Sequence, residues 1–172
     1  MPLDALISTL SLRHRIEEAS AAIKIAQSEQ KLGKIALVSS FGAEAAVLLH
    51  LVAKTAPNTP VLFLDTGKHF AETLAYQQEL SKDLGLTDLR VIKPDAARLK
   101  KEDPYGALHT FDTNACCGVR KVAPLQNALE EFDGWITGRK RYQGGIRKSL
   151  ELFTIHIFEM RKFFPEIRVR SV

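Results

Sequence analysis

Short apolar runs alternate with helix-like segments along this chain, and this alternation constrains the fold more than any other feature. The runs are mainly apolar and cover residues 35–38, 61–64, 89–92 and 135–137. Runs of about four such residues between Gly, Pro or polar residues are typical of buried strands. Strands that alternate with helices pair in parallel, because each helix returns the chain to the same end of the sheet. The sequence therefore predicts an α/β fold with an open, doubly wound parallel sheet and helices on both faces.

The segments between these runs carry the spacing of amphipathic helices. Apolar residues recur at intervals of three and four, which predicts helices over residues 11–32, 43–54, 70–84 and 119–132. Gly33 and Gly85 stand where two of these helices would end. Pro124 must lie in the first turn of the last helix or kink it.

Composition indicates a single globular domain. The chain has 172 residues, of which 45% are hydrophobic and 26% are charged, as in ordinary folded domains. No apolar run approaches the ~18 residues of a spanning helix, and the N-terminal residues do not resemble a secretory signal. Adjacent cysteines give no disulfide framework, which suits a reducing compartment. We therefore expect a cytoplasmic protein without a membrane partner.

The positive charge of the chain is concentrated after residue 138. Residues 139–172 hold nine Lys and Arg against three Glu, whereas residues 1–138 hold fifteen Lys and Arg against seventeen Asp and Glu. These cations lack the interleaved aromatic residues of a nucleic-acid platform, so no nucleic-acid partner is expected. A solvated tail and an oxyanion site at the start of this segment both remain open.

Two predicted strand-to-helix loops carry residues that suit a nucleotide. Ser39 and Ser40 begin the first loop, where small side chains allow backbone N–H groups to approach an anion. Asp65 begins the second loop, where a carboxylate at a strand tip can hold a ribose hydroxyl. Capping of the following helix is the alternative in both loops. Ligands of open parallel sheets bind beyond the carboxyl ends of the strands, so both loops are candidate sites.

Cations follow the last predicted strand at residues 139–141. Guanidinium groups bind oxyanions in a fork, so this run suits a doubly charged anion. A solvated charge run is the alternative.

Cys116 and Cys117 are the only cysteines of the chain. Consecutive Cα atoms lie ~3.8 Å apart, closer than the ~4.4–6.8 Å of relaxed disulfides. Two neighbouring thiolates can instead supply half of a four-cysteine iron–sulfur site. An anion beside these thiolates would need compensating cations, for which the candidates are Arg120, Lys121, Lys140 and Arg141.

In this order, these pieces resemble the phosphoadenosine phosphosulfate reductase family, within the adenine-nucleotide α-hydrolase-like (PP-loop type) group. The matching segments are residues 39–42, residues 64–67 with Phe70, Glu72 and Thr73, residues 116–117 with 120–121 and 124–125, and residues 138–143. The cysteine pair resembles the iron–sulfur branch of the family, the assimilatory adenylyl-sulfate (APS) reductases. The resemblance covers about residues 30–153. It predicts a nucleotide-binding α/β domain over residues 1–153 and a divergent basic and apolar tail over residues 154–172, as a frameshift would produce.

The resemblance implies a thioredoxin-dependent reduction of adenosine 5′-phosphosulfate to sulfite and AMP in assimilatory sulfate reduction. In that family a cysteine near the C-terminus attacks the sulfur, AMP leaves, and an enzyme thiosulfonate forms. Thioredoxin then releases sulfite by disulfide exchange. The complete family member holds a 4Fe–4S cluster whose charge lies close to the substrate sulfate.

Site residues are carried over from the family by matching position. The resemblance implies contacts to the nucleotide phosphate and ribose from Ser39, Ser40, Phe41 and Gly42. It implies a border to the adenosine formed by Leu64, Asp65, Thr66 and Gly67. Lys121 would lie between cluster and sulfate, Lys140 and Arg141 would hold the phosphosulfate, and Cys116 and Cys117 would be two of the four cluster ligands. Lys140 departs from the family, which has two arginines there.

The resemblance ends after Phe153, and no later residue is a cysteine. The C-terminal part of the family fold, with its nucleophile, is therefore expected to be missing, and this chain alone should carry no catalytic residue and turn over no substrate. Its cluster should be incomplete or absent unless two chains share one in a homo-oligomer. A frameshift or premature stop, a genuine divergent ending, and a sequence that is part of a longer protein all remain open.

Two other functions remain as alternatives. The first is a non-catalytic remnant that binds AMP or associates with full-length subunits. The second is an ATP-dependent PP-loop adenylyl transferase. Residues 39–44 read Ser-Ser-Phe-Gly-Ala-Glu rather than a fuller Ser-Gly-Gly-x-Asp-Ser loop, which argues against the transferase.

Overall fold

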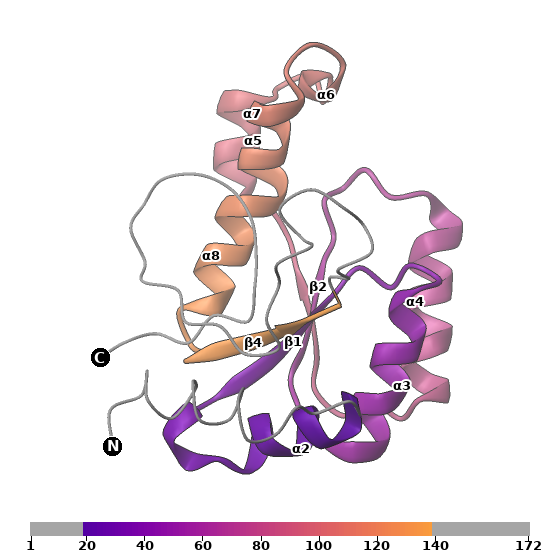
Figure 1. Ribbon diagram of the computed structural model, residues 1–172. Helices are drawn as coiled ribbons and strands as arrows, with labels where there is room; N and C mark the ends of the chain where they lie inside the picture. The colour runs from indigo at the N-terminus through magenta and orange to yellow at the C-terminus, as the bar shows by residue number, and fades with distance from the viewer. Residues whose placement is uncertain (1–18, 139–172) are drawn as a thin grey trace, which may run out of the picture.

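A four-stranded parallel sheet lies at the centre of the part of the chain that the structure describes (Figure 1). The computed structural model describes residues 19–138. The strands are β1 (Ile35–Ser39), β2 (Val61–Leu64), β3 (Leu89–Ile92) and β4 (Gly134–Thr137). Their order across the sheet is β3-β2-β1-β4, and every pairing is parallel. The parallel α/β sheet expected from the sequence is thus confirmed.

The strand order reverses next to β1. The chain passes outward from β1 to β2 and β3 and then returns to pair β4 with the other side of β1. Leu37 of β1 faces Val61 of β2 on one side and Ile136 of β4 on the other. In folds of this class, ligands bind where the strand order reverses, beyond the carboxyl ends of the strands. The loops after β1 and β4 flank that point.

Helices cover both faces of the sheet (Figure 1). On one face, Leu37 and Phe63 point into a core with α2 (Ala19–Ser28), α3 (Ala45–Thr55) and α4 (Ala71–Asp83). On the other face, Ala36 and Leu62 pack with Phe132 and with residues of α8 (Ala123–Leu129). Successive strand residues alternate between the two cores because side chains of a strand point to opposite faces in turn.

The first described helix is shorter than the spacing predicts. α2 ends at Ser28 and a 3₁₀ turn, η1 (Gln30–Leu32), follows it. The Glu29 carboxylate accepts a hydrogen bond from the Lys31 N–H at 3.3 Å, and Gly33 ends the turn with a φ of 67°. The predicted start at residue 11 lies outside the described residues. The helices predicted at 43–54 and 70–84 are found within two residues of the expected ends.

The crossover from β3 to β4 contains three helices that the periodicity does not predict. They are α5 (Ala96–Glu102), α6 (Leu108–Phe111) and α7 (Thr113–Cys117). The helix predicted over 119–132 is also divided, because a π-helical turn, η2 (Gly118–Val122), precedes α8. Pro124 lies in the first turn of α8, as expected.

None of the helices within residues 19–138 is both long enough and apolar enough to cross a membrane. The predicted domain boundary at 153, the tail over 154–172, and Lys140 and Arg141 lie outside the described residues.

Candidate functional site

The loop after β1 is held by its two serine hydroxyls. Ser39 Oγ accepts a hydrogen bond from the Phe41 N–H at 3.2 Å, and Ser40 Oγ accepts one from the Gly42 N–H at 3.4 Å. The N-cap of α3 falls on Glu44, so neither serine caps that helix. The hydroxyls instead bend the chain locally, in the manner of Ser turns.

Phe41 has an unusual backbone conformation in the middle of this loop. Its φ is 54°, a region that non-glycine residues seldom adopt. Its ring is 1% exposed and meets the Phe63 ring edge-on, with 5.3 Å between ring centroids. Burial of the ring therefore offsets the backbone cost, estimated at about 1–2 kcal/mol. With the side chain in the core, only the main chain of Phe41 is left to face a nucleotide.

The loop after β2 lies beside the first loop, because β1 and β2 are paired. Asp65 Oδ1 accepts a hydrogen bond from the Gly67 N–H at 3.0 Å, and Gly67 has a φ of 67°. Lys93 Nζ lies 3.8 Å from Asp65 Oδ2, a long pair whose lysine is well exposed, so it contributes little. The N-cap of α4 is Phe70, so Asp65 shapes the turn and does not cap the helix.

Further contacts hold the loop after β2 in place, two of them to the sheet and one within the loop. His69 Nε2 lies 2.9 Å from the Leu64 carbonyl oxygen, and the His69 ring stacks on Phe63 with 5.4 Å between centroids. Thr66 is buried, and its hydroxyl accepts a hydrogen bond from the Lys68 N–H at 3.3 Å. The predicted residues Thr66 and Gly67 therefore lie in a hydrogen-bonded turn directly after Leu64, the last residue of β2.

The cysteine pair ends α7 and leads into η2. Cys116 is buried with Leu108 and Val119, whereas Cys117 is half-buried, and both are free thiols. π-Helical turns are rare and occur often at functional sites.

The pair fits half of a four-thiolate cluster site. Two adjacent thiols are suitable donors for iron, but the sequence contains no third cysteine. Within residues 19–138, no group of three or more His, Cys, Asp or Glu side chains could hold a metal ion. A cluster would thus need donors from outside the described residues.

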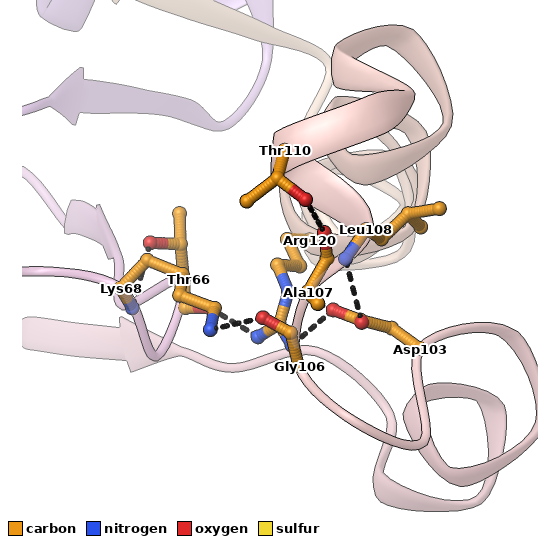
Figure 2. A network of polar contacts seen from close by, with 8 residues as sticks. All are labelled: Thr66, Lys68, Asp103, Gly106, Ala107, Leu108, Thr110 and Arg120. Carbon is orange, nitrogen blue, oxygen red and sulfur yellow. Dashed lines mark hydrogen bonds and ion pairs between the residues drawn. The ribbon is translucent and has the colours of Figure 1, made fainter.

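Arg120 does not serve as the free cation considered from the sequence. It is buried, and its Nη2 and Nε donate to Asp103 Oδ2 at 2.6 and 3.1 Å (Figure 2). Its Nη1 donates to the Thr66 carbonyl at 2.8 Å. The charge of Arg120 is therefore paired inside the protein. Lys121, the next residue, is exposed and remains available to an anion.

The pKa of Asp103 is held below its usual range. Hydrogen bonds from Arg120 are the main cause, followed by the Leu108 N–H, which donates to Asp103 Oδ1 at 3.0 Å. Asp103 thus joins the end of α5 to the start of α6 as well as to Arg120.

Lys68 makes a second connection between the loop after β2 and the crossover. Its Nζ donates to the Gly106 carbonyl at 2.6 Å (Figure 2). Sequence reasoning missed Lys68, Asp103 and Gly106. The Asp103-Pro104 step and the following Gly106 signal a turn, but no sequence signal indicates which loop that turn contacts.

The structure brings most of the predicted site residues together. Pairing of β1 with β2 and the Phe41–Phe63 contact join the loops at 39–42 and 64–67. The Arg120–Thr66 bond brings the cysteine-bearing turn against the second loop. The predicted phosphosulfate ligands Lys140 and Arg141 follow β4 in the sequence and lie outside the described residues.

Comparison with known proteins defines the family. Residues 34–169 match the phosphoadenosine phosphosulfate reductase domain, and the chain belongs to this family. An adenosine 5′-phosphosulfate reductase of Mesorhizobium japonicum is 54% identical over 120 residues, which are 70% of this chain and 47% of that protein. A protein of the same name from Chelativorans sp. is 46% identical over 155 residues, 88% of this chain and 63% of that protein. The chain thus spans less than two thirds of these relatives.

A solved structure supports the PP-loop type of fold. The crystal structure of phosphoadenylyl-sulfate reductase from Candida auris, a phosphate complex, matches with a TM-score of 0.66 over 95% of this chain and 76% of that one. Sequence identity is 19%, so this likeness concerns the fold.

Proposed function

We propose that this chain is the nucleotide-binding part of a thioredoxin-dependent reductase that converts adenosine 5′-phosphosulfate to sulfite and AMP in assimilatory sulfate reduction. The observation that carries the proposal is the contact between the cysteine-bearing turn and a strand-end loop, made by Arg120 and the Thr66 carbonyl at 2.8 Å. This contact supports the proposal, because it joins the turn that follows both cysteines to a loop at the carboxyl end of a parallel strand, where ligands bind in such sheets. Chemistry with free thiols suits the reducing cytoplasm.

The proposed nucleotide contacts come mainly from the two strand-end loops. The main chain and hydroxyls of residues 39–42 would meet the phosphate and ribose, and residues 64–67 would border the adenosine. Lys121 is exposed on the cysteine-bearing turn and would meet the sulfate. Lys140 and Arg141, outside the described residues, would complete the phosphosulfate site through charge-assisted hydrogen bonds.

Cys116 and Cys117 would hold two of the four iron positions of a 4Fe–4S cluster. When bound, the cluster would supply charge close to the substrate sulfate. The other two thiolates would come either from a further part of a longer chain or from the same two cysteines of a second copy. Burial of Cys116 beside Leu108 and Val119 favours the metal-ligand role over attack on substrate, because a nucleophile must reach the sulfur.

The proposed reaction requires a thiol that this sequence does not supply. A thiolate would form an S–S bond with the sulfate sulfur as the S–O bond to AMP breaks. A thioredoxin thiol would then attack the enzyme sulfur, and sulfite would leave with the electron pair of the S–S bond. With both cysteines assigned to iron, the 172-residue chain is expected to bind AMP and form no sulfite.

The first test measures AMP binding to the 172-residue chain by calorimetry, together with sulfite formation from adenosine 5′-phosphosulfate and thioredoxin. AMP should bind, and Asp65→Ala should weaken binding by about 10-fold, since a hydrogen bond to a charged group is lost. Asp83→Ala, an exposed change at the end of α4, is the control. Unaltered AMP affinity in Asp65→Ala would contradict the assigned site.

The same experiment separates the alternative functions. AMP binding by the chain, with no sulfite beyond what a full-length relative forms on its own when the two are mixed, would favour a non-catalytic nucleotide-binding remnant. Release of pyrophosphate from ATP would instead favour a PP-loop adenylyl transferase.

A further inference from the structure

One side chain joins three separate segments next to the candidate site. Arg120 belongs to η2, Asp103 ends α5, and Thr66 lies in the loop after β2. We propose that Arg120 is a positioning residue that holds the cysteine-bearing turn against the loop after β2, which is called the nucleotide loop below. This inference rests on the proposed function, because it assigns the role of Arg120 to that same site.

The contacts of Arg120 use three nitrogen atoms in a fixed plane. Nε and Nη2 hold Asp103 at 3.1 and 2.6 Å, while Nη1 holds the Thr66 carbonyl at 2.8 Å. The side chains of Arg120 and Asp103 are only 8% and 2% exposed. A buried ion pair offsets its loss of hydration only with good geometry and further hydrogen bonds, and both conditions are met here. The three segments are therefore held in one relative arrangement.

The nucleotide loop is fitted to this guanidinium. A Cβ atom at Gly67 would lie 3.4 Å from Arg120 Nη1, so the glycine brings its backbone close to the cation. The Thr66 carbonyl turns toward Arg120 in the same stretch in which Asp65 Oδ1 accepts the Gly67 N–H. Displacement of Arg120 would thus release the turn that presents Asp65.

Two neighbouring cations of η2 take different roles. Arg120 is buried and Lys121 is exposed, although they are consecutive residues of η2. Anchoring of Arg120 fixes the backbone from which Lys121 extends. Arg120 also lies only three residues after Cys117, so its contacts fix the orientation of the thiol pair as well.

Lysine cannot replace arginine in this role. An ammonium group has a single nitrogen, so it cannot reproduce a fork that reaches a carboxylate on one side and a carbonyl on the other. Arg120→Lys keeps the charge opposite Asp103 and removes the geometry. Arg90→Lys is a matched control, because Arg90 also forks to a carboxylate, that of Asp88, and reaches Glu131, at a different place in the fold.

The test compares Arg120→Lys, Arg90→Lys and the unmodified 172-residue chain. The first measurement is hydrogen exchange of the amides at 66–68 and 118–122 without nucleotide. Arg120→Lys should raise exchange at least ~10-fold in both segments, the loss expected for a charge-assisted hydrogen bond. Arg90→Lys should leave both segments unchanged. Unchanged exchange in Arg120→Lys, or an equal rise throughout the chain, would overturn the proposal.

The second measurement is the rate at which iodoacetamide alkylates Cys117, without and with saturating AMP. Bound AMP should slow alkylation in the unmodified chain and in Arg90→Lys. In Arg120→Lys the ratio of the two rates should approach one, because the two halves of the site are no longer held together. A general loss of stability would still let saturating AMP slow alkylation. If Arg120→Lys gave the same ratio of rates as the unmodified chain, the positioning role of Arg120 would therefore be contradicted.

A second variant tests the proposal if Arg120→Lys does not fold. Arg120→Met combined with Asp103→Asn removes both buried charges and keeps an acceptor for the Leu108 N–H. It should melt as one cooperative unit while the amides at 66–68 exchange faster. Protected amides in the double variant would overturn the proposal. If the unmodified chain binds no AMP, the proposed function fails, whereas the exchange comparison still decides the role of Arg120.

Discussion

A buried carboxylate with a lowered pKa makes stability depend on pH in a definite direction. The folded-state pKa of Asp103 lies below its ordinary value of about 3.9, mainly through hydrogen bonds from Arg120. Such a group contributes stability above its unfolded-state pKa, and the contribution is lost as the pH falls through its folded-state pKa. Asp103 should therefore stabilise the fold at neutral pH and lose this contribution progressively as the pH falls below about 4.

Asp103→Asn should remove this part of the pH dependence. The free energy of unfolding, measured with urea between pH 3 and 7, should decline less steeply below pH 4 in the variant than in the unmodified chain. Asp88 also has a lowered pKa, through Arg90, and leaves a residual slope in both proteins. Parallel curves for the two proteins would mean that Asp103 contributes no such linkage.

Single residues also mark the limit of what the sequence can predict. The loop serines were expected either to line a phosphate or to cap α3, and the capping alternative fails because α3 begins at Ala45. Arg120 was considered among the free cations because a sequence does not reveal which cation is buried. Its partner Asp103 is 17 positions away and belongs to a turn without periodicity, so nothing in the sequence pairs the two.

At the scale of elements, the strands were predictable to within one residue and the β3–β4 crossover was not. Apolar runs that are buried on both faces leave a clear sequence signal. The helices α5, α6 and α7 are too short for a helical period, and the starts of α5 and α7 depend on single side chains. Asp95 accepts the Arg98 N–H at 2.7 Å and Asp112 accepts the Ala115 N–H at 2.8 Å. A single Asp without a following apolar period is a weak start signal, because Asp is also common in turns.

The turn after β2 offers a prediction with an internal control. Gly67 and Gly85 have φ values of 67° and 63°, but only at Gly67 would a Cβ atom meet another segment, 3.4 Å from Arg120 Nη1. Alanine at either position should cost about 1–2 kcal/mol of unfolding free energy. Only Gly67→Ala should also weaken AMP binding in calorimetry. Equal AMP affinities of the two variants would argue that the conformation of this turn does not matter for the nucleotide.

At the scale of the whole molecule, the proposed cluster makes a prediction about mass. Native mass spectrometry of the 172-residue chain, purified without oxygen, should give a species near 19.2 kDa without iron or sulfide, since two thiolates do not complete a cluster. A full-length relative purified in parallel controls for loss of iron during handling. A dimer that retains four iron and four sulfide would instead mean that two copies share one cluster.

The position of β1 between β2 and β4 determines when the sheet can be completed. The Lys34 N–H, just before β1, donates to Asp133 Oδ2 at 2.7 Å across a sequence separation of 99 residues. Gly33 permits this approach, because a Cβ there would lie 2.2 Å from the same oxygen. During synthesis on the ribosome, the edge of β1 that pairs with β4 therefore stays unpaired until the whole cysteine-bearing crossover has been made. Long-range closure of this kind slows folding and exposes the nascent chain to aggregation. The free edge of β1 is therefore exposed from its own release by the ribosome until β4 has been released as well.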